Sequence, residues 1–212
     1  MNLNIPYLET DNKLLNDAYR IAAGDIVGNI VYYQNGLLTE EKPCMIAGLD
    51  YNTPWTRDTA INIWNALSIL SPEVSKNTLL AVLEEEEGSI YIGGQYWDSI
   101  IWMIGAREYC RFHKDDNFYR LAFEAGRNSV HRLEEDEFDE EDGLFRGPAV
   151  YGDGIAAYPD KYSKCPNQGS GILEWVDYPG NPVYPKGYGI PMKALSTNCV
   201  YFKAYEILAE MA

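Results

Sequence analysis

The chain has 212 residues, a net charge of −15 and a hydrophobic fraction of 46%, and it is rich in tyrosine. This length and apolar content are sufficient for a buried core, so wholesale disorder is not expected. The acidic surface repels phosphate groups, which argues against nucleic acid and anionic membranes as partners.

Six segments show the apolar spacing of amphipathic helices. Thr10-Asp11 is a capping pair before the first, and Ser71 with Pro72 suits the start of the third. The fourth is apolar on nearly all sides, so we expect it to be buried. In chain order the predicted helices cover residues 12–22, 58–70, 72–86, 96–112, 115–133 and 198–212.

Two long loops interrupt these helices, at residues 41–57 and 136–195. The second holds most of the prolines and many glycines, and loops of this length inside a domain are usually functional. We therefore expect an all-α fold in one domain, residues 1–212, in which paired helices carry loops that build a site at one end.

No metal or cofactor site is predicted. The four cysteines are far apart and form no CxxC pair, so we interpret them as reduced packing residues. The acidic run 134–142 lacks the spacing of a calcium-binding loop and is interpreted as a solvated helix end. The N-terminus shows no secretion signal and no run could span a membrane, so a cytoplasmic location is the default; a secreted or periplasmic one stays open if a leader is missing.

Three segments combine aromatic rings with carboxylates, which is the mixture that glycoside hydrolysis requires. One carboxyl group protonates the leaving oxygen, a second activates water or attacks, and aromatic faces bind the apolar side of a sugar. In the first segment, residues 53–58, Trp55 could stack on a sugar while Arg57 and Asp58 hold its hydroxyls. The alternative is a plain helix start, in which Asp58 lies near the positive end of the helix dipole and pairs with Arg57.

The second segment covers residues 93–98. Its glycines leave room for a ligand, and Trp97 with Asp98 repeats the pattern of ring and carboxylate. A helix start with Trp97 in the core is the alternative interpretation.

The third segment covers residues 142–159, where Asp153 lies between two glycines and is flanked by Tyr151 and Tyr158. Aromatic surroundings can raise the pKa of a carboxyl group, as a general acid requires. Alternatively, Asp153 only bonds its own backbone in a turn. Glu174, further along the loop, is the reserve candidate for the acid.

Together these segments resemble the six-hairpin (α/α)6 toroid glycoside hydrolases. The resemblance rests on Thr53-Pro-Trp-Thr-Arg-Asp58, Gly94-Gln-Tyr-Trp-Asp98, the loop from Gly143 to Pro159, and Ser196-Thr-Asn198 before the last helix. The families concerned include bacterial α-glucosidases related to processing glucosidase I, amylo-α-1,6-glucosidase and trehalase.

The resemblance implies a partial (α/α)6 toroid and an α-glucosidase-like, inverting hydrolase acting on an oligosaccharide. Trp55, Arg57 and Asp58 would line the subsite for the non-reducing sugar, with Trp97 and Asp98 nearby. Asp153 would be the general acid, although Gly152 and Gly154 replace the residues that usually flank it. A complete toroid has twice as many helices, and its general base normally lies in the later hairpins. We therefore expect the exposed edge to associate with the rest of a toroid or with another copy.

Two other classes of function stay open on the sequence alone. The chain could be a non-catalytic glycan-binding helical module, which needs the aromatic loops but no second carboxylate. It could also be another carbohydrate enzyme of the toroid type, a lyase or an epimerase, with Tyr151 as the base.

Overall fold

The computed structural model describes residues 5–48, 50–94, 96–150 and 192–212, and the fold in these ranges is mostly helical. The helices are α1 (Lys13–Gly28), α2 (Thr56–Asn62), α3 (Ser68–Leu70), α4 (Pro72–Ala81), α5 (Trp97–Phe112), α6 (Asp116–Glu137) and α8 (Leu195–Met211), with a π-helical turn, η1 (Ile63–Leu67), between α2 and α3. The prediction of a mostly helical fold is confirmed. The expectation that the fold is all-α was wrong in one respect, because the described ranges also contain three short β-hairpins.

The hairpins are antiparallel pairs of strands. They are β1 (Ile30–Tyr33) with β2 (Lys42–Met45), β3 (Leu83–Glu86) with β4 (Ser89–Ile92), and β5 (Phe138–Asp139) with β6 (Leu144–Phe145). The predicted loop 41–57 therefore begins with a strand. The helix predicted over 72–86 was wrong in its last turn, because α4 ends at Ala81 and the glutamates after Val82 pair with β4.

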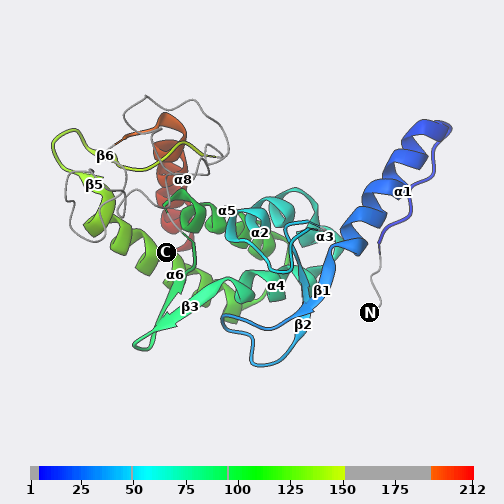
Figure 1. The fold of residues 1–212 in the computed structure, drawn as a ribbon, viewed down its shortest axis with the longest axis horizontal. Coiled ribbons are helices and arrows are strands. Elements are labelled where there is room, and N and C mark those ends of the chain that lie inside the picture. The colour runs from blue at the N-terminus through cyan, green and yellow to red at the C-terminus, as the bar shows by residue number, and fades with distance from the viewer. Residues whose placement is uncertain (1–4, 49, 95, 151–191) are drawn as a thin grey trace.

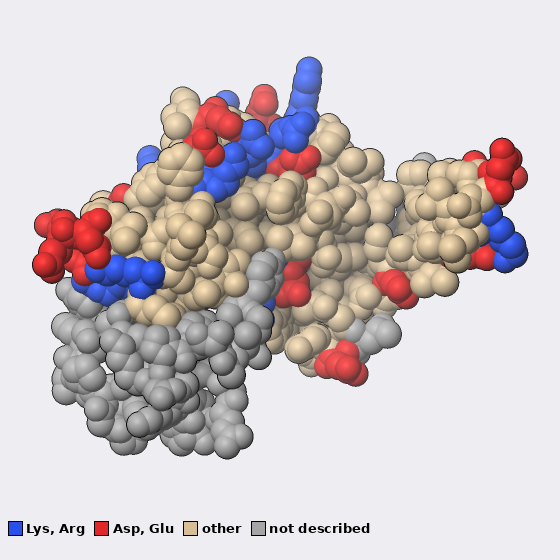
Figure 2. All heavy atoms as spheres, turned by 90° about the horizontal axis from the view of Figure 1, so that it is seen from above, with Lys and Arg blue, Asp and Glu red and all other residues tan. Residues whose placement is uncertain are grey.

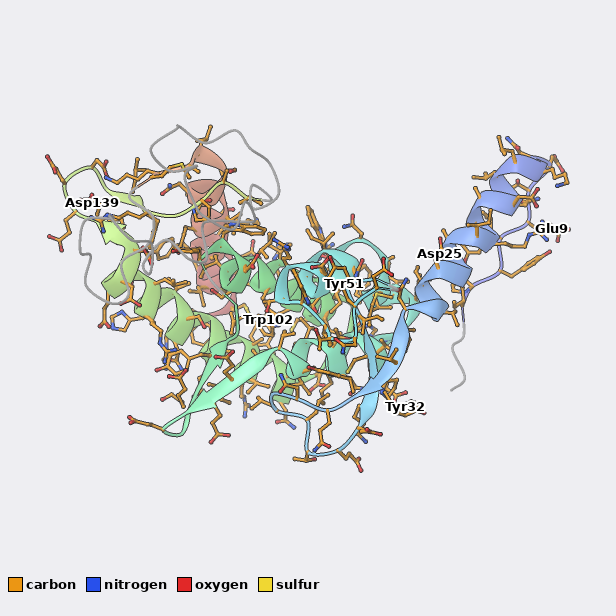
Figure 3. All side chains as sticks on the ribbon, viewed as in Figure 1. Glu9, Asp25, Tyr32, Tyr51, Trp102 and Asp139 are labelled. Carbon is orange, nitrogen blue, oxygen red and sulfur yellow. The ribbon has the colours of Figure 1, made fainter. Side chains whose placement is uncertain are left out.

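Helices α2, α5 and α8 form one row, and α4 and α6 pack against it and lie below it in the view of Figure 1. Helix α5 is in the middle, in contact with α2 on one side and α8 on the other. Its apolar character all round is explained by this position, because neighbours cover it from several directions. Trp102 in α5 is fully buried at the centre of the core, and its indole N–H donates to the carbonyl of Leu79 at 3.3 Å (Figure 3).

The row is packed closely where α2 crosses α5. A Cβ atom on Gly105 would lie 2.8 Å from the Cα of Ala60, so only a glycine fits at this crossing. At the far side of α5, Trp102 and Tyr109 both contact the ring of Phe118 in α6. These contacts fix the positions of the loops at the ends of the helices.

The turn η1 changes which side of the 56–70 helical stretch is buried. Ile63 and Leu67 are buried, whereas Trp64 is 49% exposed and Ile69 is 58% exposed. Trp64 and Ile69 are both among the main apolar residues of the helix predicted over 58–70, so burial would be the usual expectation for them. The extra residue in the π-helical turn rotates the following side chains away from the register of a regular helix, which explains the difference.

Helix α1 stands apart from the rest of the molecule and projects from one end (Figure 1). It begins one residue after the predicted start at 12, because the cap is Asn12, whose side chain accepts hydrogen bonds from the N–H groups of Leu14 and Leu15. It continues to Gly28, beyond the predicted end at 22. None of its residues is buried.

Candidate functional site

The first predicted segment forms the N-terminal end of α2. Trp55 is the residue before the helix, with extended backbone, and 40% of it is exposed. Tyr51, which is 48% exposed, lies beside it with the two ring centroids 5.1 Å apart in an edge-on arrangement (Figure 3). A turn closed by the bond from the Tyr51 N–H to the Gly48 carbonyl holds Tyr51 in place. Two exposed rings at one helix end give an apolar surface for a ligand.

Arg57 lies between two tryptophan rings. Its guanidinium carbon is 5.3 Å from the ring centroid of Trp55 and 5.8 Å from that of Trp97, and both are cation–π contacts. Its Nε atom is 3.6 Å from a carboxylate oxygen of Asp58, in the first turn of α2. The Arg57 side chain is only 16% exposed and that of Asp58 is 34% exposed. The carboxylate therefore reaches solvent while the cation is held behind it.

The second predicted segment, at the start of α5, touches the first. The hydroxyl of Thr56 donates to the carbonyl of Gly93 at 2.9 Å. Gly94 has φ +106°, and a Cβ atom there would lie 3.2 Å from the Cβ of Asp98 and 3.3 Å from the hydroxyl of Thr56. A glycine is therefore required both by the backbone conformation and by the close approach. The N-terminal ends of α2 and α5 meet at this point.

The two predicted residues at the start of α5 have different surroundings. Trp97 is 3% exposed and packs against Ala60 and Ile101, so its ring forms the back wall of the site behind Arg57 and is not an open stacking surface. Asp98 lies in the first turn of α5 and is partly exposed. Each of Asp58 and Asp98 thus lies at the positive end of a helix dipole, which favours the ionised carboxylate.

The described beginning of the third segment reaches the same end of the helix row. Gly147 lies against Tyr96, since a Cβ atom there would be 3.3 Å from the tyrosine ring. Val150 packs on the cluster that contains Ala60, Trp97 and Ile101. The four remaining predicted site residues, Tyr151, Asp153, Tyr158 and Glu174, lie outside the described residues.

The start of α8 is bonded to this segment. The N–H of Val150 donates to the hydroxyl of Ser196 at 3.0 Å, and the hydroxyl of Thr197 donates to the carbonyl of Pro148. The N-terminal ends of α2, α5 and α8 therefore all lie at the end of the row that carries the predicted site.

A cluster of ions holds the β5–β6 hairpin to the chain before α8. Lys193 donates to Asp139 at 2.7 Å and to Asp142 at 2.5 Å, and Arg146 lies 2.8 Å from the same Asp139 carboxylate. The hydrogen bond from Lys193 is the main cause that lowers the pKa of Asp139 to about 2. The acidic run was interpreted as a solvated helix end. Its second half instead supplies two carboxylates to this ion cluster.

The described side chains offer little for metal or thiol chemistry. Within the described ranges no three His, Cys, Asp or Glu side chains lie together as metal ligands. Burial raises the pKa of the Cys44 and Cys110 thiols to about 12, so neither is a thiolate nucleophile at neutral pH. The described groups at this end of the molecule are two exposed rings, carboxylates and one shielded cation.

Sequence reasoning missed two contributors to this end of the molecule. Tyr51 was not singled out, although it stands four residues before Trp55 in the same aromatic loop, which is a signal that could have found it. Asn198 was noted only as part of a motif. It holds the backbone of Phe145, a contact between residues far apart in sequence that no local pattern reveals.

Comparisons with protein-family models, with curated proteins and with solved structures find no match to this chain. In the described part of the chain, no helix has the length and apolar character needed to cross a membrane. Functional interpretation therefore depends on the geometry of the site and on the motifs that form it.

Proposed function

We propose that this chain is part of an inverting glycoside hydrolase of the (α/α)6 toroid type and that its site binds a neutral oligosaccharide. One observation carries the proposal: two segments that resemble these enzymes, 53–58 and 93–98, meet at the same end of the helix row, joined by the Thr56–Gly93 hydrogen bond. Helices α3 and α4 and the β3–β4 hairpin lie between them in the sequence, so the two segments are brought together by the fold.

The arrangement of the helices supports the toroid part of the proposal. A toroid of helical hairpins places alternate helices in an inner and an outer layer. Here α2, α5 and α8 would be inner helices, and α4 and α6 would be outer ones (Figure 1). In this proposal the described helices would form part of such a ring, and the loops at the N-terminal ends of the inner helices would form the substrate site.

In this proposal the described residues bind the substrate and a carboxyl group of the long loop acts on it. Trp55 and Tyr51 contact the apolar face of a sugar, and Asp58 accepts hydrogen bonds from its hydroxyls. Arg57 holds the Asp58 carboxylate in position. Asp153 is the general acid, with Glu174 as the reserve, and the general base comes from helices that complete the ring.

A second candidate function is a non-catalytic glycan-binding module. It is favoured by the fact that rings and hydroxyl-binding carboxylates are found together at the described site, which suffices for binding without turnover. Both functions require that neutral oligosaccharides bind at Trp55.

The test has two stages. Calorimetry with a panel of neutral α- and β-linked oligosaccharides should detect binding that is lost in Trp55→Ala; no heat with any sugar would argue against both functions. Hydrolysis of the bound sugar should then give a product of inverted anomeric configuration by proton NMR, and Asp153→Asn should abolish it while binding is kept. Binding without hydrolysis, with the other helices of the ring supplied, would favour the binding module.

A further inference from the structure

The start of α8 bonds the backbone of the segment 145–150 through side-chain hydroxyls. The hydroxyl of Thr197 donates to the carbonyl of Pro148, and the hydroxyl of Ser196 accepts from the N–H of Val150 at 3.0 Å. Thr197 is fully buried, so water does not replace its bond. The two hydroxyls therefore determine where Val150 lies relative to α8. Neither has a part in the substrate contacts proposed for this end of the molecule.

The chain just before Pro148 is held by other contacts. The N–H of Gly147 donates to the carbonyl of Met192 at 2.8 Å, and Lys193 bonds to Asp139 in the β5–β6 hairpin. Figure 2 shows acidic and basic side chains gathered at the end of the molecule that carries this hairpin. Because these contacts do not involve the two hydroxyls, removing a hydroxyl should release residues 148–150 and leave the hairpin in place.

Val150 is linked to the site by packing. Its side chain packs on the buried cluster that contains Trp97. The ring of Trp97 contacts the guanidinium of Arg57, with 5.8 Å from the ring centroid to the guanidinium carbon, and Nε of Arg57 is 3.6 Å from the carboxylate of Asp58. A packed interior has few voids and transmits displacement. A shift of Val150 should therefore move the cation that holds the Asp58 carboxylate.

We propose that Thr197 and Ser196 are positioning residues of the site. They hold Val150 on the cluster that contains Trp97, and this cluster fixes Arg57 and, through it, Asp58. The inference rests on the proposed function, because it takes Asp58 to be the carboxylate that binds the hydroxyls of the sugar. Neither hydroxyl of α8 touches the sugar. A binding site must be held to within about 0.5 Å of its productive geometry, so a small shift of Val150 is enough to weaken binding.

The test compares variants that differ by one hydroxyl. Thr197→Val removes the bond to Pro148 and keeps the shape of the side chain, whereas Thr197→Ser keeps the hydroxyl. Ser129→Ala is the matched control, because the Ser129 hydroxyl also accepts a backbone N–H, that of Ile92, in another part of the fold. Ser196→Ala, at an exposed position, is the milder second variant, which keeps the test decisive if circular dichroism shows that Thr197→Val does not fold.

Proton–nitrogen NMR of the full chain gives a measurement that needs no sugar. The Nε–H resonance of Arg57, assigned by its loss in Arg57→Lys, senses the two tryptophan rings beside the guanidinium. It should move in Thr197→Val and, by less, in Ser196→Ala, and it should keep its wild-type position in Thr197→Ser and Ser129→Ala. An unmoved resonance in both Thr197→Val and Ser196→Ala, or an equal shift in Ser129→Ala, would overturn the inference.

Calorimetry with the panel of neutral oligosaccharides gives the second measurement. Thr197→Val should weaken binding about three- to ten-fold, since small misplacements of positioning groups are costly, and Thr197→Ser and Ser129→Ala should bind like the wild type. Wild-type affinity in Thr197→Val, despite a moved Arg57 resonance, would overturn the positioning role and leave the proposed sugar binding intact. A wild type that binds no sugar would overturn the proposed function instead, and the Arg57 resonance would still decide whether the two hydroxyls position the cation.

Discussion

The side-chain amide of Asn198 pairs with the backbone of Phe145 through two hydrogen bonds. Its oxygen accepts from the Phe145 N–H at 2.8 Å, and its nitrogen donates to the Phe145 carbonyl at 3.1 Å. The Phe145 ring also stacks on Tyr201, one turn further along α8, with centroids 3.6 Å apart. The short strand β6 and the helix α8, which are far apart in sequence, are thus joined by matched backbone and ring contacts.

We expect Asn198→Ala to destabilise the protein by about 2–3 kcal/mol, because two backbone groups lose their partner. Urea unfolding measures the change. Asn65→Ala is a suitable control, since the Asn65 amide donates only to the carbonyl of Ile61 on an exposed helix surface. If the free energy of unfolding falls by the same small amount in both variants, Asn198 does not hold the β5–β6 hairpin to α8.

The crossing of α2 and α5 gives a second prediction. Gly105→Ala would place a methyl group 2.8 Å from the backbone of Ala60, so the two helices must separate, and we expect a loss of about 1–3 kcal/mol. Gly24→Ala, in α1, has nothing within 4 Å of the added atom and should stabilise the protein by about 0.5–1 kcal/mol. Thermal unfolding should show a lower melting temperature for Gly105→Ala and a higher one for Gly24→Ala. An unchanged melting temperature in Gly105→Ala would contradict the close packing of α2 on α5.

Most helices could be predicted from the sequence because their apolar spacing is regular and their caps are local. Helix α6 is an example, since it begins within one residue of the predicted start at 115, where the side chain of Asp115 caps it, and Phe118 and Ala122 are buried. The failures have non-local causes. The run of glutamates from 84 to 87 favours a helix by intrinsic propensity, yet the chain turns at Glu87 and Gly88, both with positive φ, to form a hairpin.

Tertiary contacts stabilise that hairpin. The N–H of Ile92 donates to the buried hydroxyl of Ser129 at 2.8 Å, and the amide of Asn128 donates to the carbonyl of Ile90. In the sequence, Ser129 is a polar residue that interrupts the apolar face of α6. Its hydroxyl instead satisfies the backbone of a strand, which a single-sequence pattern cannot reveal.

The site was predictable in part. Trp55, Arg57 and Asp58 are neighbours in sequence, so their proximity follows from the motif. The contact between Arg57 and Trp97 depends on the packing of α2 on α5, and the burial of Trp97 depends on Ala60. The family resemblance implies that both tryptophans lie near the substrate, whereas the alternative interpretation of segment 93–98 placed Trp97 in the core. The fold leaves Trp55 accessible and buries Trp97, as the alternative expected.

Acid should weaken the ion cluster at the β5–β6 hairpin. The pKa of Asp139 is lowered to about 2 by Lys193, below its ordinary value of 3.8, so its contribution to stability is present above pH 4 and is lost as the pH falls towards 2. Asp139→Asn should lower the urea midpoint at pH 6 and make its decrease between pH 4 and pH 2 shallower. Lys193→Met should also lower the midpoint, and the double variant should lose less than the sum of the two single variants, because Lys193 also bonds to Asp142 and Asp139 also contacts Arg146. Fully additive effects would show that the two side chains are not coupled.

Two exposed tryptophans allow a matched test of the site. Trp55 is 40% exposed beside Tyr51, and Trp64 is 49% exposed on the π-helical turn. Loss of a stacking ring removes about 1.5–3 kcal/mol of apolar contact, so Trp55→Ala should weaken the binding of a neutral oligosaccharide by about ten-fold or more. Trp64→Ala removes a ring of the same kind and should leave the affinity unchanged in calorimetry. Equal losses in both variants would mean that the sugar contacts apolar surface without selecting the α2–α5 site, whereas a loss confined to Trp55 would assign the sugar to that site.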